Sequence, residues 1–141
     1  MARAAARLRV ADLRVTGPRV AVLVTLETLD GHVDAESVRK EVEQRLGSVS
    51  TQTVYDALRA LTTAGIIRCT ETPGHPARYE MRVGDNHHHV VCRRCGFTLD
   101  VDCLIGAAPC LSAELPAGFI VDEAAITFRG LCRDCAALTT A

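Results

Sequence analysis

Two Cys-x-x-Cys pairs constrain the fold of this 141-residue chain more than any other feature of its sequence. Cys92 and Cys95 form the first pair, and Cys132 and Cys135 form the second, with 36 residues between the two pairs. Two intervening residues let both thiolates of a pair reach one tetrahedral ion from a tight turn, and two such pairs complete a closed four-thiolate zinc site. The sequence therefore predicts a structural Zn2+ that ties the end of the chain back to the start of this segment.

The segment that carries these cysteines is short, and a unit of about 60 residues buries little hydrophobic core. A zinc ion would cross-link this segment. The free energy of metal binding would then add to the free energy of folding and offset the small core. Disulfide bonds are the competing interpretation, but seven cysteines are an odd number, and paired Cys-x-x-Cys motifs favour zinc. Cys103 and Cys110 are interpreted either as a redox pair or as buried small hydrophobic residues.

A run of three histidines lies directly before the first cysteine pair, in the sequence DNHHHVVCRRCG of residues 85–96. Alternate residues of a strand point to the same face, so His87 and His89 should point together and His88 away from them. Two imidazoles suit Fe2+, Zn2+ or Mn2+, and such a second metal needs further histidine or carboxylate ligands. The candidates for these further ligands are His32, Glu80, Asp100 and Asp102.

The distribution of cysteines and histidines divides the chain into two parts. Every cysteine except Cys69 lies after residue 90, and the sequence Gly-Asp-Asn just before the histidines is a turn signal. We therefore expect a first domain over residues 1–82, a hinge over residues 83–86 and a second domain over residues 87–141. A metal held by ligands from both domains would fix their relative orientation and act as an allosteric switch.

The first domain has the pattern of four helices followed by a β-hairpin. Helix N-caps are predicted at Thr16, Asp34 and Ser50, and Gly47 and Gly65 are stop signals. Two β-rich segments then flank the turn sequence PGHP. A helix, a turn, a second helix and a hairpin form a winged helix-turn-helix. The second domain is expected to combine strands in HHVVC, FTLDVD and GFIVDEAAITFRG with a short helix in APCLSAEL. The predicted fold class is therefore α+β, with a winged-helix domain followed by a small α/β dimerisation domain.

The second helix of the helix-turn-helix is the predicted recognition helix. Hydroxyls, an amide and an aromatic ring near its N-terminus suit base edges and thymine methyl groups in a major groove, whereas Arg59 is better placed for phosphate. The predicted contacts are Ser50, Thr51, Gln52, Thr53, Tyr55 and Arg59. An ordinary polar helix face is the alternative, but the hairpin that follows favours DNA. The first 20 residues, with five arginines and one aspartate, also suit an anionic partner.

Other classes of protein are disfavoured. No apolar run approaches the roughly 20 residues of a membrane-spanning helix, and the basic N-terminus lacks the apolar core of a secretory signal, so a cytoplasmic location is expected. A zinc-dependent hydrolase or deaminase is the alternative of another class. However, the chain has no His-x-Glu, and a four-thiolate site leaves no open position for catalysis. No enzymatic activity and no small-molecule substrate are therefore expected.

The motifs taken together resemble those of the ferric uptake regulator (Fur) family of bacterial metal-dependent repressors. LRVTGPRVAVL, HVDAESV, STQTVYDALRALTTAGII, ARYE, NHHHVVCRRCG and GLCRDC occur in the family's order. VGDNHHH and VDCLIGAAPCL resemble the FurA/CatR-like branch, whose members typically repress a catalase-peroxidase and themselves in response to peroxide and iron. The resemblance implies a homodimer, formed through the C-terminal domain, that binds an inverted AT-rich operator.

The resemblance also implies roles for individual residues. The structural zinc ligands are Cys92, Cys95, Cys132 and Cys135. The ligands of a regulatory metal, Fe2+ with Mn2+ or Zn2+ as alternatives, are His32, Glu80, His87, His89 and Asp100. The DNA contacts include Tyr55, Arg14 and Arg19. Many members carry His-His-Asp-His where this chain has Asn-His-His-His at residues 86–89, so a third metal site is not expected.

The sequence therefore predicts a metal-dependent repressor that responds to peroxide or iron. A general iron-uptake or zinc-uptake regulator of the same family is the alternative, because sites built from histidines and carboxylates accept several metals.

Overall fold

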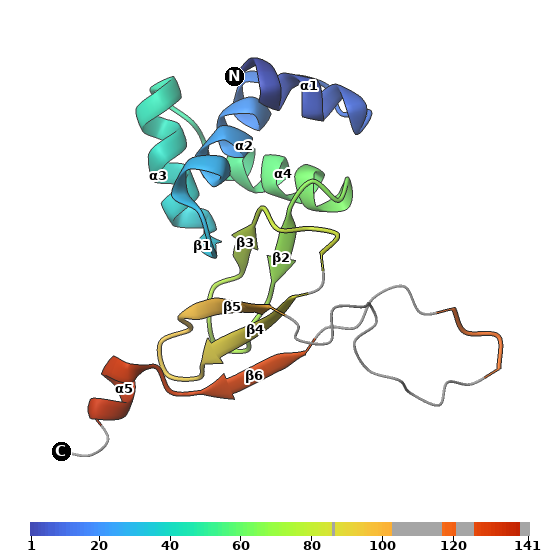
Figure 1. Cartoon of the computed structure of the whole chain (residues 1–141). Helices are drawn as coiled ribbons and strands as arrows, with labels where there is room; N and C mark the ends of the chain where they lie inside the picture. Colours follow the sequence, from blue (N-terminus) through green and yellow to red (C-terminus); the bar gives the residue numbers. More distant parts are fainter. Residues whose placement is uncertain (86, 103–116, 121–125, 139–141) are drawn as a thin grey trace. The chain divides into compact units, whose positions relative to one another are not determined.

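The computed structural model describes residues 1–85, 87–102, 117–120 and 126–138, and the chain divides into two compact units, Met1–Val83 and Gly84–Ala141 (Figure 1). The first unit contains α1 (Ala2–Val10), α2 (Gly17–Leu29), β1 (Val33–Asp34), α3 (Ala35–Leu46), α4 (Thr51–Thr63), β2 (Arg68–Thr70) and β3 (Arg78–Glu80). The second unit contains β4 (His87–Cys92), β5 (Thr98–Asp102), β6 (Thr127–Gly130) and α5 (Arg133–Ala137). None of the helices in the described ranges has the length and apolar character that a membrane crossing requires.

Side-chain N-caps begin α2, α3 and α4, at the residues that the sequence predicted. Thr16, Asp34 and Ser50 each accept a hydrogen bond from the backbone N–H three residues later, at 3.5, 2.8 and 3.1 Å. These bonds satisfy N–H groups that have no partner inside the helix. Gly47 ends α3 with a φ of 81°, a conformation that residues with a Cβ rarely adopt. Local rules therefore fix where these helices begin and end.

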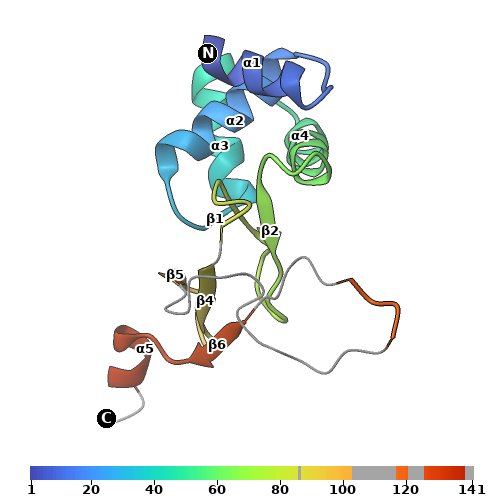
Figure 2. The same ribbon diagram turned by 45° about the vertical axis from the view of Figure 1, so that its right-hand side comes forward.

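The first unit is a winged helix. Helices α2, α3 and α4 pack against one another, and residues 47–50 form the turn between α3 and α4 (Figures 1 and 2). The antiparallel hairpin of β2 and β3 follows α4, with Cys69 opposite Tyr79. Strand β1 pairs with the other edge of β3, which gives the sheet order β1-β3-β2. The predicted order of four helices and a hairpin is confirmed, whereas the two-residue strand β1 was not predicted.

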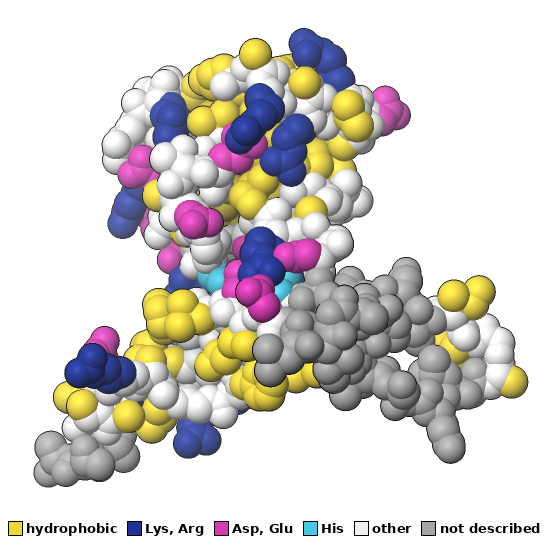
Figure 3. Space-filling model, in the orientation of Figure 1, with side chains coloured by type: hydrophobic (Ala, Val, Ile, Leu, Met, Phe, Trp, Pro, Cys, Tyr) yellow, Lys and Arg dark blue, Asp and Glu magenta, His cyan; other side chains and the backbone are white. Residues whose placement is uncertain are grey.

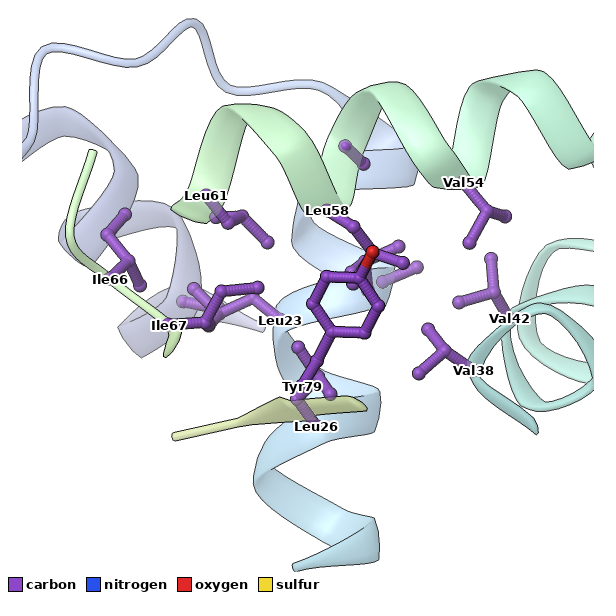
Figure 4. Close-up of a cluster of buried hydrophobic side chains, with 14 of the residues drawn as sticks. Leu23, Leu26, Val38, Val42, Val54, Leu58, Leu61, Ile66, Ile67 and Tyr79 are labelled. Carbon is purple, nitrogen blue, oxygen red and sulfur yellow. The ribbon is translucent and has the colours of Figure 1, made fainter. Parts of the chain in front are cut away.

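The hydrophobic core of the first unit lies between its helices and the hairpin (Figure 4). Val54, Leu58 and Leu61 occupy one face of α4, at the helical spacing i, i+4, i+7, and all three are buried. The ring of Tyr79 on β3 is also buried against this cluster. This packing leaves the opposite face of α4 exposed, which is the face that carries the predicted DNA contacts.

Thr25 is a fully buried polar residue of α2, a helix that contributes to this core. Its side chain is fully buried, and its hydroxyl has no hydrogen-bond partner among the described residues. An unsatisfied buried hydroxyl costs about 1–3 kcal/mol. Thr25→Val keeps the shape and removes the hydroxyl, so we expect the free energy of unfolding of the first unit to rise by roughly 1 kcal/mol. Chemical denaturation measures this change, and Thr25→Ser, which keeps the hydroxyl and loses a methyl group, should destabilise the unit instead.

The second unit is built on a mixed sheet with the order β5-β4-β6. Strand β4 pairs antiparallel with β5 and parallel with β6. The strands expected in HHVVC and FTLDVD are confirmed, and the last expected strand is described over Thr127–Gly130. The helix expected in APCLSAEL lies outside the described residues, as do Cys103 and Cys110.

Candidate functional site

The four paired cysteines form one cluster in the second unit, in which the Sγ atoms of all four lie within 4.8 Å of one another. Cys92 ends β4, and Cys132 is the N-cap of α5. The Sγ atoms of Cys95 and Cys132 are 3.8 Å apart. This distance is far longer than a disulfide bond of about 2.05 Å. It is close to the edge, about 3.8 Å, of a tetrahedron whose zinc–sulfur bonds are about 2.3 Å long. The four thiols therefore have the geometry of one tetrahedral metal site.

The protonation of these thiols also favours a bound cation. Backbone hydrogen bonds at Cys132 and Cys95 lower the pKa of Cys92 to about 6. Burial raises the pKa of Cys135 to about 12. One thiol is thus ready to ionise at neutral pH, because backbone N–H groups stabilise its thiolate, and another is not, because burial penalises its charged form. Several thiolates this close would also repel one another without a positive ion between them. A divalent metal removes this repulsion and releases the remaining protons.

The two faces of β4 carry different chemistry. Residues directly opposite in a strand pair share a face, so His89 and its partner Asp100 on β5 point the same way. His87 lies on this face too, and its ring centroid is 5.0 Å from that of His89. His88 is on the other face, opposite Val101, and its ring contacts Phe128 edge-on at 6.4 Å. The alternation predicted for the histidine run is therefore present in the structure.

His87, His89 and Asp100 converge within the second unit. The Oδ1 atom of Asp100 is 3.9 Å from the Nε2 atom of His87 and 3.7 Å from the Nε2 atom of His89. Both imidazole side chains are buried, and the Asp100 carboxylate is mostly so. Two imidazoles and one carboxylate are a ligand set that suits Fe2+, Mn2+ or Zn2+. Asp102, which the sequence offered as another ligand, lies opposite His87 on β5 and is exposed.

A second pair of predicted ligands meets within the first unit. The Nε2 atom of His32 is 3.8 Å from a carboxylate oxygen of Glu80, and both side chains are 2% exposed. His32 lies just before β1 and Glu80 ends β3, so the pairing of β1 with β3 places them together. The guanidinium of Arg78 donates to the backbone carbonyl of His32 at 3.1 Å, which fixes the segment before β1. The unpredicted strand β1 is therefore what positions His32.

The predicted recognition helix exposes several of its candidate contacts. Thr51 and Gln52 are exposed, and Tyr55 is 49% exposed. The hydroxyl of Ser50 has a structural role, because it caps α4 and forms a 2.8 Å hydrogen bond with the hydroxyl of Thr53. These side chains lie at the N-terminal end of α4, where backbone N–H groups and the helix dipole also favour phosphate.

Arg59 is held by a carboxylate that sequence reasoning did not single out. The carboxylate of Asp56 accepts hydrogen bonds from Gln52 at 3.0 Å and from Arg59 at 2.9 Å. The spacings i, i+4 and i, i+3 that allow these contacts could have been read from the sequence. Asp56 thus restrains two of the predicted DNA contacts on the exposed face of α4.

Arg14 and Arg19 lie beside α4, the predicted recognition helix. A hollow of ≈ 350 Å³ is lined by Arg14, Thr16, Pro18, Arg19, Thr53, Asp56 and Ala57. The guanidinium of Arg19 donates to the backbone carbonyl of Arg14 at 3.0 Å, which keeps the two residues together. In contrast, Arg3 and Arg7 form ion pairs with Glu27, at 3.5 and 3.1 Å. The carboxylate of Glu27 therefore offsets part of the positive charge of the N-terminal end.

An apolar face covers one side of the second unit's sheet. We use this name for Val90, Leu99, Val101 and Phe128, which are 37–53% exposed and share a face by strand register. The space-filling view shows hydrophobic side chains gathered over this sheet (Figure 3). The face is the reverse of the one that carries His87, His89 and Asp100.

A winged helix linked to a unit with a four-thiolate cluster and a separate group of histidines and carboxylates defines a metal-binding regulator of the winged-helix class. Comparison with known proteins gives the family, because the model of the ferric uptake regulator family matches residues 10–105, and the chain belongs to this family. It is 54% identical over 131 residues to the transcriptional regulator FurA of Mycobacterium tuberculosis, covering 93% of this chain and 88% of FurA. It is 50% identical over 130 residues to the ferric uptake regulation protein 2 of Mycolicibacterium fortuitum, covering 91% and 89% of the two chains.

The fold agrees with solved structures of the family. The ferric uptake regulator of Pseudomonas aeruginosa, determined with manganese, superposes with a TM-score of 0.69 and 25% identity, over 91% of this chain and 96% of that chain. The predicted family and the α+β fold class are therefore confirmed. The protein is a metal-binding transcriptional regulator and not an enzyme, so the hydrolase or deaminase alternative is wrong.

Proposed function

We propose that this regulator is a metal-dependent repressor, responsive to peroxide and iron, that binds an AT-rich palindromic operator as a homodimer. The observation that carries the proposal is the convergence of His87, His89 and Asp100 on one face of β4 and β5, at 3.7–3.9 Å between ligand atoms. This group differs chemically from the cysteine cluster, because its donor atoms are nitrogen and oxygen and not sulfur. A site of this kind exchanges its metal more readily than a closed four-thiolate site.

The regulatory metal would draw ligands from both units. His32 and Glu80 of the first unit are already in contact with each other at 3.8 Å, and they supply one imidazole and one carboxylate. The second unit supplies His87, His89 and Asp100. Together these five residues make a set of nitrogen and oxygen donors large enough to enclose a divalent ion, while either group alone leaves positions open. Metal would then favour one relative arrangement of the units and disfavour others.

Fe2+ is the proposed regulatory metal. Two histidines and a carboxylate are the donor set of many non-haem Fe2+ sites, and iron would supply one-electron reactivity toward peroxide. The protein would hold the imidazole and carboxylate ligands in place, with their side chains largely shielded from water. The manganese in the Pseudomonas aeruginosa structure supports a divalent ion of this type, and it leaves Mn2+ as an alternative.

DNA recognition is assigned to α4 and its surroundings. Tyr55, Gln52 and Thr51 are exposed for contacts with bases. Arg14, Arg19 and Arg59 lie around the same helix and would contact phosphates. A homodimer would present two such helices to the two halves of a palindrome. The apolar face of the second unit is the proposed contact between the two copies, because it is exposed in the single chain, and His88 contacts Phe128 on that side.

The proposal is tested by titrating metal against operator binding. Zinc-loaded protein, freed of exchangeable metal, is mixed with a DNA fragment from its own promoter region, and Fe2+, Mn2+ or Zn2+ is added under anaerobic conditions. We expect Fe2+ to raise operator affinity at least tenfold and a subsequent peroxide pulse to reverse the effect. Activation by Zn2+ alone would point to a zinc-uptake regulator, and Fe2+ activation without a peroxide effect would point to a general iron-uptake regulator. Operator binding that is equal with and without every metal would contradict the proposal.

A further inference from the structure

The carboxylate of Asp85 contacts the ring of His87 on the side away from Asp100. The Oδ1 atom of Asp85 is 2.8 Å from the Nδ1 atom of His87, while the Nε2 atom of the same ring faces Asp100 at 3.9 Å. The two nitrogens of His87 therefore have different partners. One faces a carboxylate outside the group of ligands, and the other faces the group itself.

The geometry points to Asp85 as a positioning residue that fixes the protonation and orientation of His87 for the regulatory metal. This inference rests on the proposed function, because it assumes that His87 is a ligand of that metal. A neutral imidazole carries its proton on only one nitrogen. A carboxylate at 2.8 Å from Nδ1 accepts a hydrogen bond from it. The proton then resides on Nδ1, and the lone pair of Nε2 is left for a metal.

The surroundings of the pair strengthen this effect. The His87 side chain is 0% exposed, whereas the Asp85 side chain is 41% exposed. A buried ring has little freedom to turn, so the hydrogen bond to Asp85 holds Nδ1 on that side and leaves Nε2 facing the other ligands. A carboxylate behind a metal-binding histidine also makes the imidazole a stronger donor, and its removal typically weakens metal binding by about 10–100-fold.

The backbone before Asp85 explains how the carboxylate reaches the ring. Gly84 has a φ of 73°, a left-handed conformation that favours glycine. This turn lies directly after the first unit, which ends at Val83. Asp85 therefore belongs to the segment that leads from Glu80 on β3 to His87 on β4. A metal bound to His87 would be connected to this segment through the Asp85 hydrogen bond.

The inference is tested on the full-length zinc-loaded protein with Mn2+ as the probe, because Mn2+ is stable in air and its free concentration is measured by electron paramagnetic resonance. We expect Asp85→Ala to weaken Mn2+ binding by about 10–100-fold. Asp85→Asn keeps an oxygen that can accept a hydrogen bond from Nδ1, so this variant should lose less than about tenfold in Mn2+ affinity. Asp102→Asn removes a charge opposite His87 on β5 but leaves the hydrogen bond in place. If it weakens binding as much as Asp85→Ala, the effect is one of charge and the inference is wrong.

A second measurement reads the proton directly and needs no metal. The 15N NMR signals of the histidine rings distinguish protonated from unprotonated ring nitrogens. For His87 we expect a proton on Nδ1 in the unmodified protein and in Asp85→Asn, and a mixture of the two tautomers in Asp85→Ala. A His87 ring whose tautomer is the same in all three proteins would overturn the inference, even if metal affinity changed.

The variant His87→Ala separates failure of this inference from failure of the proposed function. If His87→Ala binds Mn2+ as tightly as the unmodified protein, His87 is not a ligand and the proposed site falls with the inference. If His87→Ala loses the metal while Asp85→Ala keeps it, the proposed site stands and only the role of Asp85 is refuted. As a control, the zinc content of every variant is measured. We expect one ion per chain in each variant, and this result would show that the cysteine cluster is intact.

Discussion

Replacing Cys132 by serine should abolish tight zinc binding and unfold the second unit. Serine keeps the size of the side chain but offers no thiolate, so a four-sulfur site with a 3.8 Å contact between Cys95 and Cys132 loses one corner of its tetrahedron. Structural zinc contributes an apparent binding free energy of about 10–16 kcal/mol in small domains. This is as large as the whole free energy of unfolding of a typical domain, about 5–15 kcal/mol.

The unfolding should be confined to the second unit. The first unit has its own core between α2, α3, α4 and the hairpin, so helical circular dichroism should largely persist. Amide exchange should become fast in β4, β5 and β6, and bound zinc should fall well below one ion per chain. Removing zinc from the unmodified protein with a strong chelator should give the same pattern, and adding zinc back should reverse it.

Cys69→Ser is the matched control for this prediction. Cys69 lies on β2 in the first unit, whereas the cluster belongs to the second. Burial raises the pKa of the Cys69 thiol and so favours its protonated form. We expect this variant to hold one zinc ion and to keep slow exchange in β4. A Cys132→Ser protein that remains folded in its second unit without metal would show that zinc is not the cross-link we infer.

The sequence was sufficient to predict those features of the structure that depend only on residues close together in the chain. The N-caps at Thr16, Asp34 and Ser50 are local hydrogen bonds, and the structure contains all three. Strand alternation likewise predicts that His88 faces away from its two neighbours. The gathering of the thiols is also predictable, because the spacing within each Cys-x-x-Cys pair already restricts where its sulfurs can meet an ion.

Contacts between distant segments were harder to predict. Strand β1 has only two residues, and its position depends on pairing with β3, more than 40 residues later, so no periodicity in the sequence reveals it. The ion pairs that Arg3 and Arg7 make with Glu27 depend on how α1 packs against α2. The contact between Asp85 and His87 spans two residues, but it depends on a left-handed turn that composition alone does not specify.

Replacing His89 by alanine should shift the response to metal to a much higher metal concentration without affecting the fold. His89 lies opposite Asp100 in the strand pair, and its Nε2 atom is 3.7 Å from the carboxylate. If both residues bind the regulatory ion, the variant loses a direct ligand, which should weaken metal binding by at least about 100-fold, more than loss of a supporting hydrogen bond does. In operator-binding assays, the concentration of Fe2+ or Mn2+ needed for half-maximal binding should rise by the same factor.

The neighbouring His88 provides the matched control, because His88→Ala deletes an identical side chain from the same strand on the opposite face. We expect His88→Ala to respond to metal at the normal concentration, because the lost contact with Phe128 lies on the face away from the proposed ligands. The affinity of His89→Ala for operator in the absence of metal should equal that of the unmodified protein, because the ligand acts only by stabilising the metal-bound arrangement of the units. If His88→Ala loses the metal response and His89→Ala retains it, the regulatory site lies on the other face of β4, and the proposed ligand set is wrong.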